Sequence, residues 1–128
     1  MNVPTDRKYS ETHEWFLVEE HVVTMGITQY AADELTDITY VELPDAGTSV
    51  AVGDQIGEVE SVKATSEIFT SVAGEIIEVN AALVDHPELL NEDAFEEGWL
   101  VKIRPDSSEP FTALLDARDY KALVRDAG

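Results

Sequence analysis

Two short runs of alternating apolar residues, with one lysine between them, constrain the fold of this chain more than any other feature. Residues 55–60 carry Ile56 and Val59 with polar residues between them, and residues 67–71 form a second run. Alternation of this kind is typical of strands with one buried face. Lys63 lies between the two runs. We therefore expect a β-hairpin that holds Lys63 at its tip.

The rest of the chain predicts many short strands and few helices. Thr28 and Asp116 have the residue types of helix N-caps. We expect strands at residues 15–18, 22–25, 38–43, 75–79 and 98–103, helices at 29–35 and 117–125, helical turns on either side of Pro87 and at 111–115, and a mobile lead-in over the first eight residues. Evenly spaced short strands indicate a small β-sandwich or barrel. We expect one domain over residues 1–128, because no linker divides the chain.

The charge of the chain excludes two classes of partner. The sequence has 27 acidic residues against 8 Lys and Arg, which gives a net charge of −19. Nucleic-acid binding needs clustered cations, and an anionic membrane surface attracts cations in the same way. No stretch approaches the roughly 18 apolar residues of a membrane span. We expect instead protein partners that present positive patches.

The sequence lacks the residues for thiol chemistry and the spacing for a metal site. The absence of cysteine removes disulfides, thiolate ligands and thiol catalysis, and it is compatible with a reducing cytosol. His13, His21 and His86 are far apart and in polar contexts, so we expect them to have surface or capping roles. The N-terminus has neither the apolar core of a signal peptide nor an Arg-rich presequence.

Lys63 is the residue best placed for chemistry. At an exposed hairpin tip its amine would be accessible to a modifying enzyme. The neighbouring Glu58 and Glu60 favour the ammonium form, whereas a Schiff-base or general-base lysine needs desolvation or nearby cations. Acylation of Lys63 by another enzyme therefore fits the sequence better than a nucleophilic role.

Residues 60–64, Glu-Ser-Val-Lys-Ala, match the lipoylation motif of a known family. The chain resembles the H proteins of the glycine cleavage system over nearly its whole length, and Lys63 takes the place of the modified lysine. Lipoyl domains of 2-oxoacid dehydrogenases usually carry Asp-Lys-Ala, and biotinyl domains carry Met-Lys-Met, so neither fits. The other matching stretches, in order, are residues 13–15, 26–28, 41–44, 74–75, 78–80 and 98–100.

The resemblance implies a mainly β fold, a barrel-sandwich hybrid with an N-terminal hairpin, a short helix and a C-terminal helix. It implies a monomeric carrier that is not an enzyme, with lipoic acid amide-linked to Lys63. The partners would be glycine decarboxylase, an aminomethyltransferase, dihydrolipoyl dehydrogenase and lipoylating enzymes. The location would be the cytoplasm, or the mitochondrial matrix for a processed eukaryotic form.

The resemblance also suggests where the loaded arm rests. We hypothesise that Glu14 and Glu67, with Thr12 or main-chain groups, bind the ammonium of the aminomethylated arm through charge-assisted hydrogen bonds. We expect Trp15 and Trp99 to be core anchors. The chain departs from the family at Thr36, where glycine is common after the short helix. Because a left-handed conformation is costly for a β-branched residue, we expect the helix to end differently here.

Three other functions are compatible with the sequence. The protein could relay lipoyl groups to subunits of 2-oxoacid dehydrogenases. It could be an enzyme that uses Lys63 as a nucleophile, although the sequence places no base or cation near that lysine. It could also be an interaction module in which Lys63 is unmodified.

Overall fold

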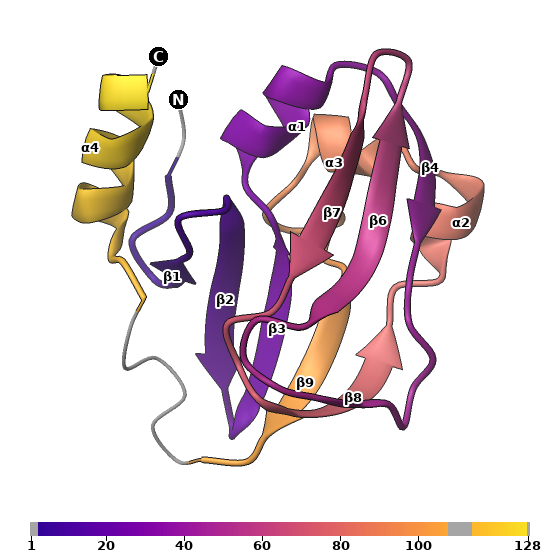
Figure 1. Cartoon of the computed structure of the whole chain (residues 1–128), viewed down its shortest axis with the longest axis vertical. Helices are drawn as coiled ribbons and strands as arrows, with labels where there is room; N and C mark the ends of the chain where they lie inside the picture. The colour runs from indigo at the N-terminus through magenta and orange to yellow at the C-terminus, as the bar shows by residue number, and fades with distance from the viewer. Residues whose placement is uncertain (1–2, 108–113, 128) are drawn as a thin grey trace.

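The computed structural model describes residues 3–107 and 114–127, and two antiparallel sheets make up most of the fold (Figure 1). The three-stranded sheet has the order β4-β6-β7, and β6 and β7 form the expected hairpin. The six-stranded sheet has the order β1-β2-β3-β9-β8-β5. The strands are β1 (Lys8–Tyr9), β2 (Glu14–Glu19), β3 (Val22–Ile27), β4 (Ile38–Glu42), β5 (Ser49–Val50), β6 (Gln55–Ser61), β7 (Thr65–Phe69), β8 (Gly74–Val79) and β9 (Val101–Pro105).

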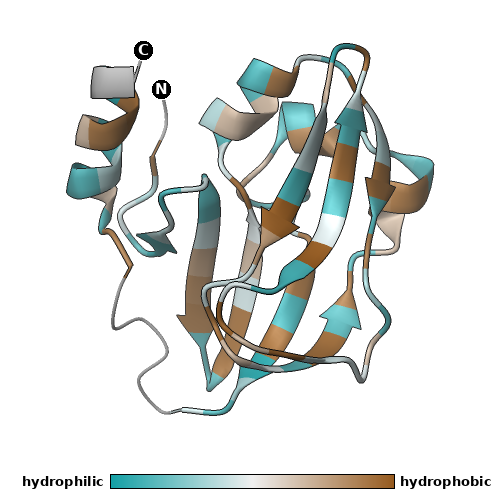
Figure 2. Cartoon of the chain, viewed as in Figure 1, coloured by the Kyte–Doolittle hydropathy of each residue, from teal (hydrophilic) through white to brown (hydrophobic). Residues whose placement is uncertain are grey.

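Hydrophobic and hydrophilic positions mix along the strands of both sheets (Figure 2). The buried apolar side chains form one core between the two sheets. Val23 and Met25 of the six-stranded sheet and Ile56 and Val59 of the other sheet are all buried in this core. The two sheets are not joined into a closed barrel, so the arrangement is sandwich-like. The expected mainly β fold is confirmed, since an apolar face of each sheet is buried against the other.

The part of the chain that the structure describes forms four helices, at places where local sequence signals predicted helical structure. They are α1 (Gln29–Leu35), α2 (Ala82–Asp85), α3 (Leu89–Glu92) and α4 (Ala117–Ala127). Thr28 Oγ1 accepts the Ala31 N–H at 3.2 Å, and Asp116 Oδ1 accepts the Asp119 N–H at 2.8 Å. Both predicted N-caps are therefore confirmed. Among the described residues no helix is both long enough and apolar enough to cross a membrane.

The N-terminal segment differs from the expected mobile lead-in, because Val3 and Arg7 are buried. The guanidinium of Arg7 lies 4.7 Å from the Trp15 ring centroid and donates to Phe95 O at 2.9 Å. These contacts belong to a second apolar cluster, in which α4 packs beside β1. No local sequence pattern around Arg7 predicts that this charged residue is buried. The turn expected at 111–115 lies largely outside the described residues.

Thr36 ends α1 in a strained conformation, with φ of 61° and ψ of −144°. This region is close to one that only glycine occupies readily, and it costs about 1–3 kcal/mol for other residues. Asn91 of α3 stabilises the corner. Its Nδ2 donates to Thr36 O at 2.6 Å, and its Oδ1 accepts the Ile38 N–H at 3.0 Å. The helix ends where a glycine would end it, and α3 holds the threonine in place.

Replacing Thr36 with glycine should therefore stabilise the protein. We expect Thr36→Gly to raise the free energy of unfolding by about 1 kcal/mol, because glycine adopts positive φ without steric cost. Urea unfolding would measure the change. Thr39→Gly is the matched control, since Thr39 lies in β4 and is not among the positive-φ residues. That variant should lose stability, and a similar loss in Thr36→Gly would contradict the role of strain.

Candidate functional site

Lys63 is exposed at the tip of the β6–β7 hairpin, as predicted. Ser61 organises this tip. Its Oγ accepts the N–H groups of Lys63 at 3.2 Å and Ala64 at 3.1 Å, and its main-chain N–H donates to Ala64 O at 2.8 Å. Sequence reasoning missed Ser61, although a serine that precedes a turn residue by two positions is a recognised signal for such bonds.

The tip is also attached to the corner after α1. Val62 donates its main-chain N–H to Asp37 O at 3.0 Å, while its side chain is 67% exposed. Asp37 follows Thr36, so the strained corner supports the hairpin tip directly. No ion pair with the described residues involves Lys63. The tip therefore has an ordered backbone and a free lysine side chain.

Glu14, at the start of β2, is a buried carboxylate and is only 1% exposed. Its Oε1 accepts hydrogen bonds from the hydroxyls of Ser10, at 2.6 Å, and Thr12. Its Oε2 accepts the Phe69 N–H of β7 at 3.2 Å. The carboxylate thus connects the two sheets. The sequence identified Glu14 and Thr12 but not Ser10 or the Phe69 N–H. Ser10 is only four residues from Glu14, whereas the Phe69 contact joins residues 55 apart and depends on the tertiary fold.

Burial raises the pKa of Glu14, because desolvation disfavours the carboxylate form. The hydrogen bonds from Ser10, Thr12 and Phe69 act in the opposite direction but are smaller effects. None of the three donors carries a positive charge. Glu14 is therefore a carboxylate that a nearby cation would stabilise.

Glu67 is exposed on β7, two residues before Phe69, and lies outside the hydrogen-bonded cluster around Glu14. Two residues of strand span about 7 Å. Glu67 is directly opposite Glu58, and Glu58 is directly opposite Glu42. Like charges at such positions repel, and no ion pair between described residues neutralises these three. The structure thus brings Thr12 and Glu14 into contact and leaves Glu67 in a row of unpaired acids.

His13 corrects the expectation that the histidines have surface roles. It is half-buried, with Nδ1 2.8 Å from Tyr120 Oη of α4. Desolvation lowers the pKa of His13, and the negative charge of Glu34 opposes this effect. His21 is exposed in the β2–β3 turn and His86 is exposed at the end of α2, as expected. Among the described residues no group of His, Asp and Glu could hold a metal ion.

The two tryptophans have different environments. Trp15 is buried, and its indole N–H donates to Ala94 O at 3.0 Å, so its expected role as a core anchor is confirmed. Trp99 is only partly buried, and Lys102 Nζ lies 5.2 Å from its ring centroid. Trp99 packs against the second cluster from outside.

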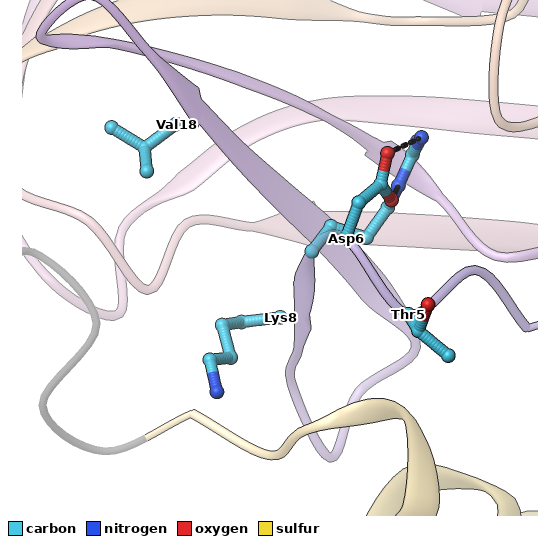
Figure 3. Close-up of a pocket in the computed structure, with 5 residues that line it drawn as sticks. Thr5, Asp6, Lys8 and Val18 are labelled. Atoms are coloured by element: carbon cyan, nitrogen blue, oxygen red, sulfur yellow. Dashed lines mark hydrogen bonds and ion pairs between the residues drawn. The ribbon is translucent and has the colours of Figure 1, made fainter.

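A pocket of about 220 Å³ lies at β1 and is separate from the hairpin tip. Its lining includes Asp6, Arg7, Lys8 and Val18 (Figure 3). Arg7 Nε donates to Asp6 Oδ1 at 2.8 Å, and Lys8 points away from that pair. The charges of Asp6 and Arg7 are satisfied by each other, and the pocket contains none of the residues predicted for function.

Because Glu14 is buried, the stability of the folded protein should depend on pH. Below pH 4.5, the ordinary pKa of the group, Glu14 is protonated in both folded and unfolded chains. As the pH rises, the unfolded chain ionises first, so the wild type loses stability until the pH passes the folded pKa. Glu14→Gln keeps an acceptor for the Phe69 N–H and does not ionise. We expect Glu14→Gln to gain stability relative to the wild type from pH 4 to 7.

Urea unfolding across this pH range would test the effect of ionisation. Glu67→Gln, at an exposed position of β7, controls for the loss of one negative charge. The assignment is wrong if the stability difference between the wild type and Glu14→Gln does not change with pH.

The chain matches proteins of one family over almost its full length. The model of the family "Glycine cleavage H-protein" matches residues 7–127. The glycine cleavage system H protein of a Psychrobacter species is 48% identical over 122 residues, which cover 94% of this chain and 97% of that protein. The H protein of Thermus thermophilus is 48% identical over 124 residues, covering 97% of each chain.

A solved structure supports the same assignment. The crystal structure of a glycine cleavage system H protein from Mycobacterium marinum superposes with a TM-score of 0.88 at 34% sequence identity, covering 98% of this chain and 100% of that one. The sequence match and the shared fold span the hairpin tip, the buried Glu14 and the C-terminal helix together. The chain therefore belongs to the glycine cleavage H-protein family, the lipoyl carriers of the glycine cleavage system.

Proposed function

We propose that this chain carries lipoic acid in amide linkage to Nζ of Lys63 and shuttles the aminomethyl group of glycine. The observation that carries the proposal is the exposed Lys63 side chain on an ordered turn. An enzyme that acylates the amine needs access to Nζ and a fixed backbone around it. The Ser61 hydrogen bonds supply the fixed backbone. The residues present therefore fit the attachment of the group.

A bound lipoyl group supplies a disulfide that accepts the aminomethyl carbon, and the reactions themselves belong to partner enzymes. We propose that these partners are glycine decarboxylase, an aminomethyltransferase, dihydrolipoyl dehydrogenase and the lipoylating enzymes. The protein itself is then a carrier with no catalytic residues. It would act as a cytoplasmic monomer whose acidic surface meets basic docking surfaces on each partner.

Thr12, Glu14 and Glu67 would hold the loaded arm, whose terminal amine is a cation near neutral pH. Both oxygens of Glu14 already accept hydrogen bonds from neutral donors. A carboxylate has further lone pairs, so an ammonium group can bind Oε1 beside Ser10 or replace the Thr12 donor. The cation would favour the ionised form of Glu14. The exposed Glu67 would supply a second negative charge on the approach to this position.

The attachment site can be tested by intact mass. We expect protein isolated from its native host to carry one lipoyl adduct, and Lys63→Arg to lack it, because arginine cannot be acylated by the same enzyme. Lys121→Arg is the control, since Lys121 is another exposed lysine. An unmodified native protein, or an adduct that persists in Lys63→Arg, would refute the assignment.

The resting position of the arm can be tested by the rate at which the isolated, loaded protein releases ammonia. We expect isolated, aminomethyl-loaded Glu14→Gln to release ammonia about tenfold faster than the wild type, the factor for losing one charge-assisted hydrogen bond of about 1.4 kcal/mol. Glu67→Gln should show a smaller increase, because its carboxylate is exposed to water.

Glu20→Gln is the matched control for this experiment. Glu20 lies in the β2–β3 turn, at the end of β2 opposite to Glu14. Its loss removes one charge without touching the hydrogen-bonded cluster, so its release rate should equal that of the wild type. Equal rates in Glu14→Gln and the wild type would refute the resting position.

A further inference from the structure

His13 has an unfavourable backbone conformation between Thr12 and Glu14. Its φ is 72°, a left-handed value that is uncommon for residues other than glycine. The His13 N–H donates to Ser10 O at 3.2 Å, and the Ser10 N–H donates to Glu14 O at 2.9 Å. These local bonds close a tight turn. A strained turn persists only where surrounding structure determines its geometry.

Contacts from two helices hold His13 in place. Thr28, the N-cap of α1, donates its main-chain N–H to His13 O at 3.0 Å. The ring of Tyr30, also on α1, lies 4.8 Å from the imidazole centroid. From α4, Tyr120 shares a hydrogen bond of 2.8 Å with Nδ1 of His13. The imidazole thus lies between two helices that are far apart in the sequence.

Tyr120 is itself fixed in position. It is fully buried, and its ring stacks on Tyr9 with 4.8 Å between centroids. Its hydroxyl lies 2.7 Å from Thr28 Oγ1 as well as 2.8 Å from His13 Nδ1. Either direction of the shared protons leaves this chain of hydrogen bonds complete. One hydroxyl therefore joins the C-terminal helix, the N-cap of α1 and the strained turn.

We propose that Tyr120 is a positioning residue that holds the turn at residues 10–14 in the geometry that receives the amine of the loaded arm. The inference rests on the proposed function, because it takes Thr12 and Glu14 as the groups that bind the arm. Tyr120 acts through His13, and His13 lies between these two residues. The C-terminal helix is then part of the arm-binding site without touching the arm.

Tyr120→Phe tests this inference, because it removes the hydroxyl and keeps the ring that stacks on Tyr9. We expect the isolated, aminomethyl-loaded variant to release ammonia about fivefold faster than the wild type, the factor for losing the one of its two hydrogen bonds that holds His13. Tyr30→Phe is the matched control. Its ring contacts the same imidazole, but among the described residues its hydroxyl makes no hydrogen bond, so the release rate should not change.

Three further readouts separate positioning from a general loss of stability. Lipoylation of Lys63 and reoxidation of the unloaded dithiol should proceed at wild-type rates in Tyr120→Phe. Amide hydrogen exchange of residues 12–14 should be faster, while exchange in the β6–β7 hairpin should not change. The double variant Tyr120→Phe/Glu14→Gln should release ammonia no faster than Glu14→Gln alone, since both changes act on one site.

The outcomes distinguish this inference from the proposed function. If Glu14→Gln accelerates ammonia release and Tyr120→Phe does not, the positioning role is wrong and the resting position stands. If Glu14→Gln has no effect, the resting position fails, and this inference fails with it. Unchanged amide exchange at residues 12–14 in Tyr120→Phe would overturn the link between α4 and the turn even if ammonia release were faster.

Discussion

Burial of the facing sheet surfaces is the interaction on which the rest of this structure depends. A net charge of −19 favours expansion of the chain, so the apolar core between the sheets must outweigh self-repulsion. Nearly all carboxylates lie outside that core. Among the described residues Glu14 is the one buried acid, and three neutral donors reduce the cost of its burial without removing it. The proposed role of Glu14 follows from this position, since a cationic amine bound there would offset the remaining cost of burying the carboxylate.

Short polar side chains that hydrogen-bond to the main chain order the backbone around the hairpin tip that carries Lys63. Ser61 shapes the hairpin tip, Asn91 holds the corner that supports the tip, and Thr28 begins α1 while bonding to the turn before β2. Each of these residues makes a hydrogen bond to a main-chain group. These bonds order the backbone near the site without enlarging the apolar core. The lysine side chain at the tip keeps its freedom. A lipoyl group attached there, as proposed, would extend from an ordered backbone.

Prediction from the sequence succeeded where a signal is local and failed where a partner is remote. Thr28 predicted the start of α1 because an N-cap is formed by residues that are adjacent in the chain. The expected run at residues 67–71 is instead Thr65–Phe69, because pairing with β6 sets the register. Arg7 was expected in a mobile segment, and its burial depends on Trp15 and on Phe95, 88 residues away.

The sequence by itself determined the fold class, the family and the place of Lys63 at an exposed hairpin tip. Residue type, alternation and motif spacing are properties of short segments, so they can be recognised without knowing the tertiary contacts. Only the tertiary structure decided that Glu14 is buried, that Phe69 is its partner across the sheets, and that Tyr120 reaches His13 over 107 residues. These depend on how two sheets and a terminal helix pack together. Packing brings together residues that are far apart in the chain, and no local sequence pattern predicts such contacts.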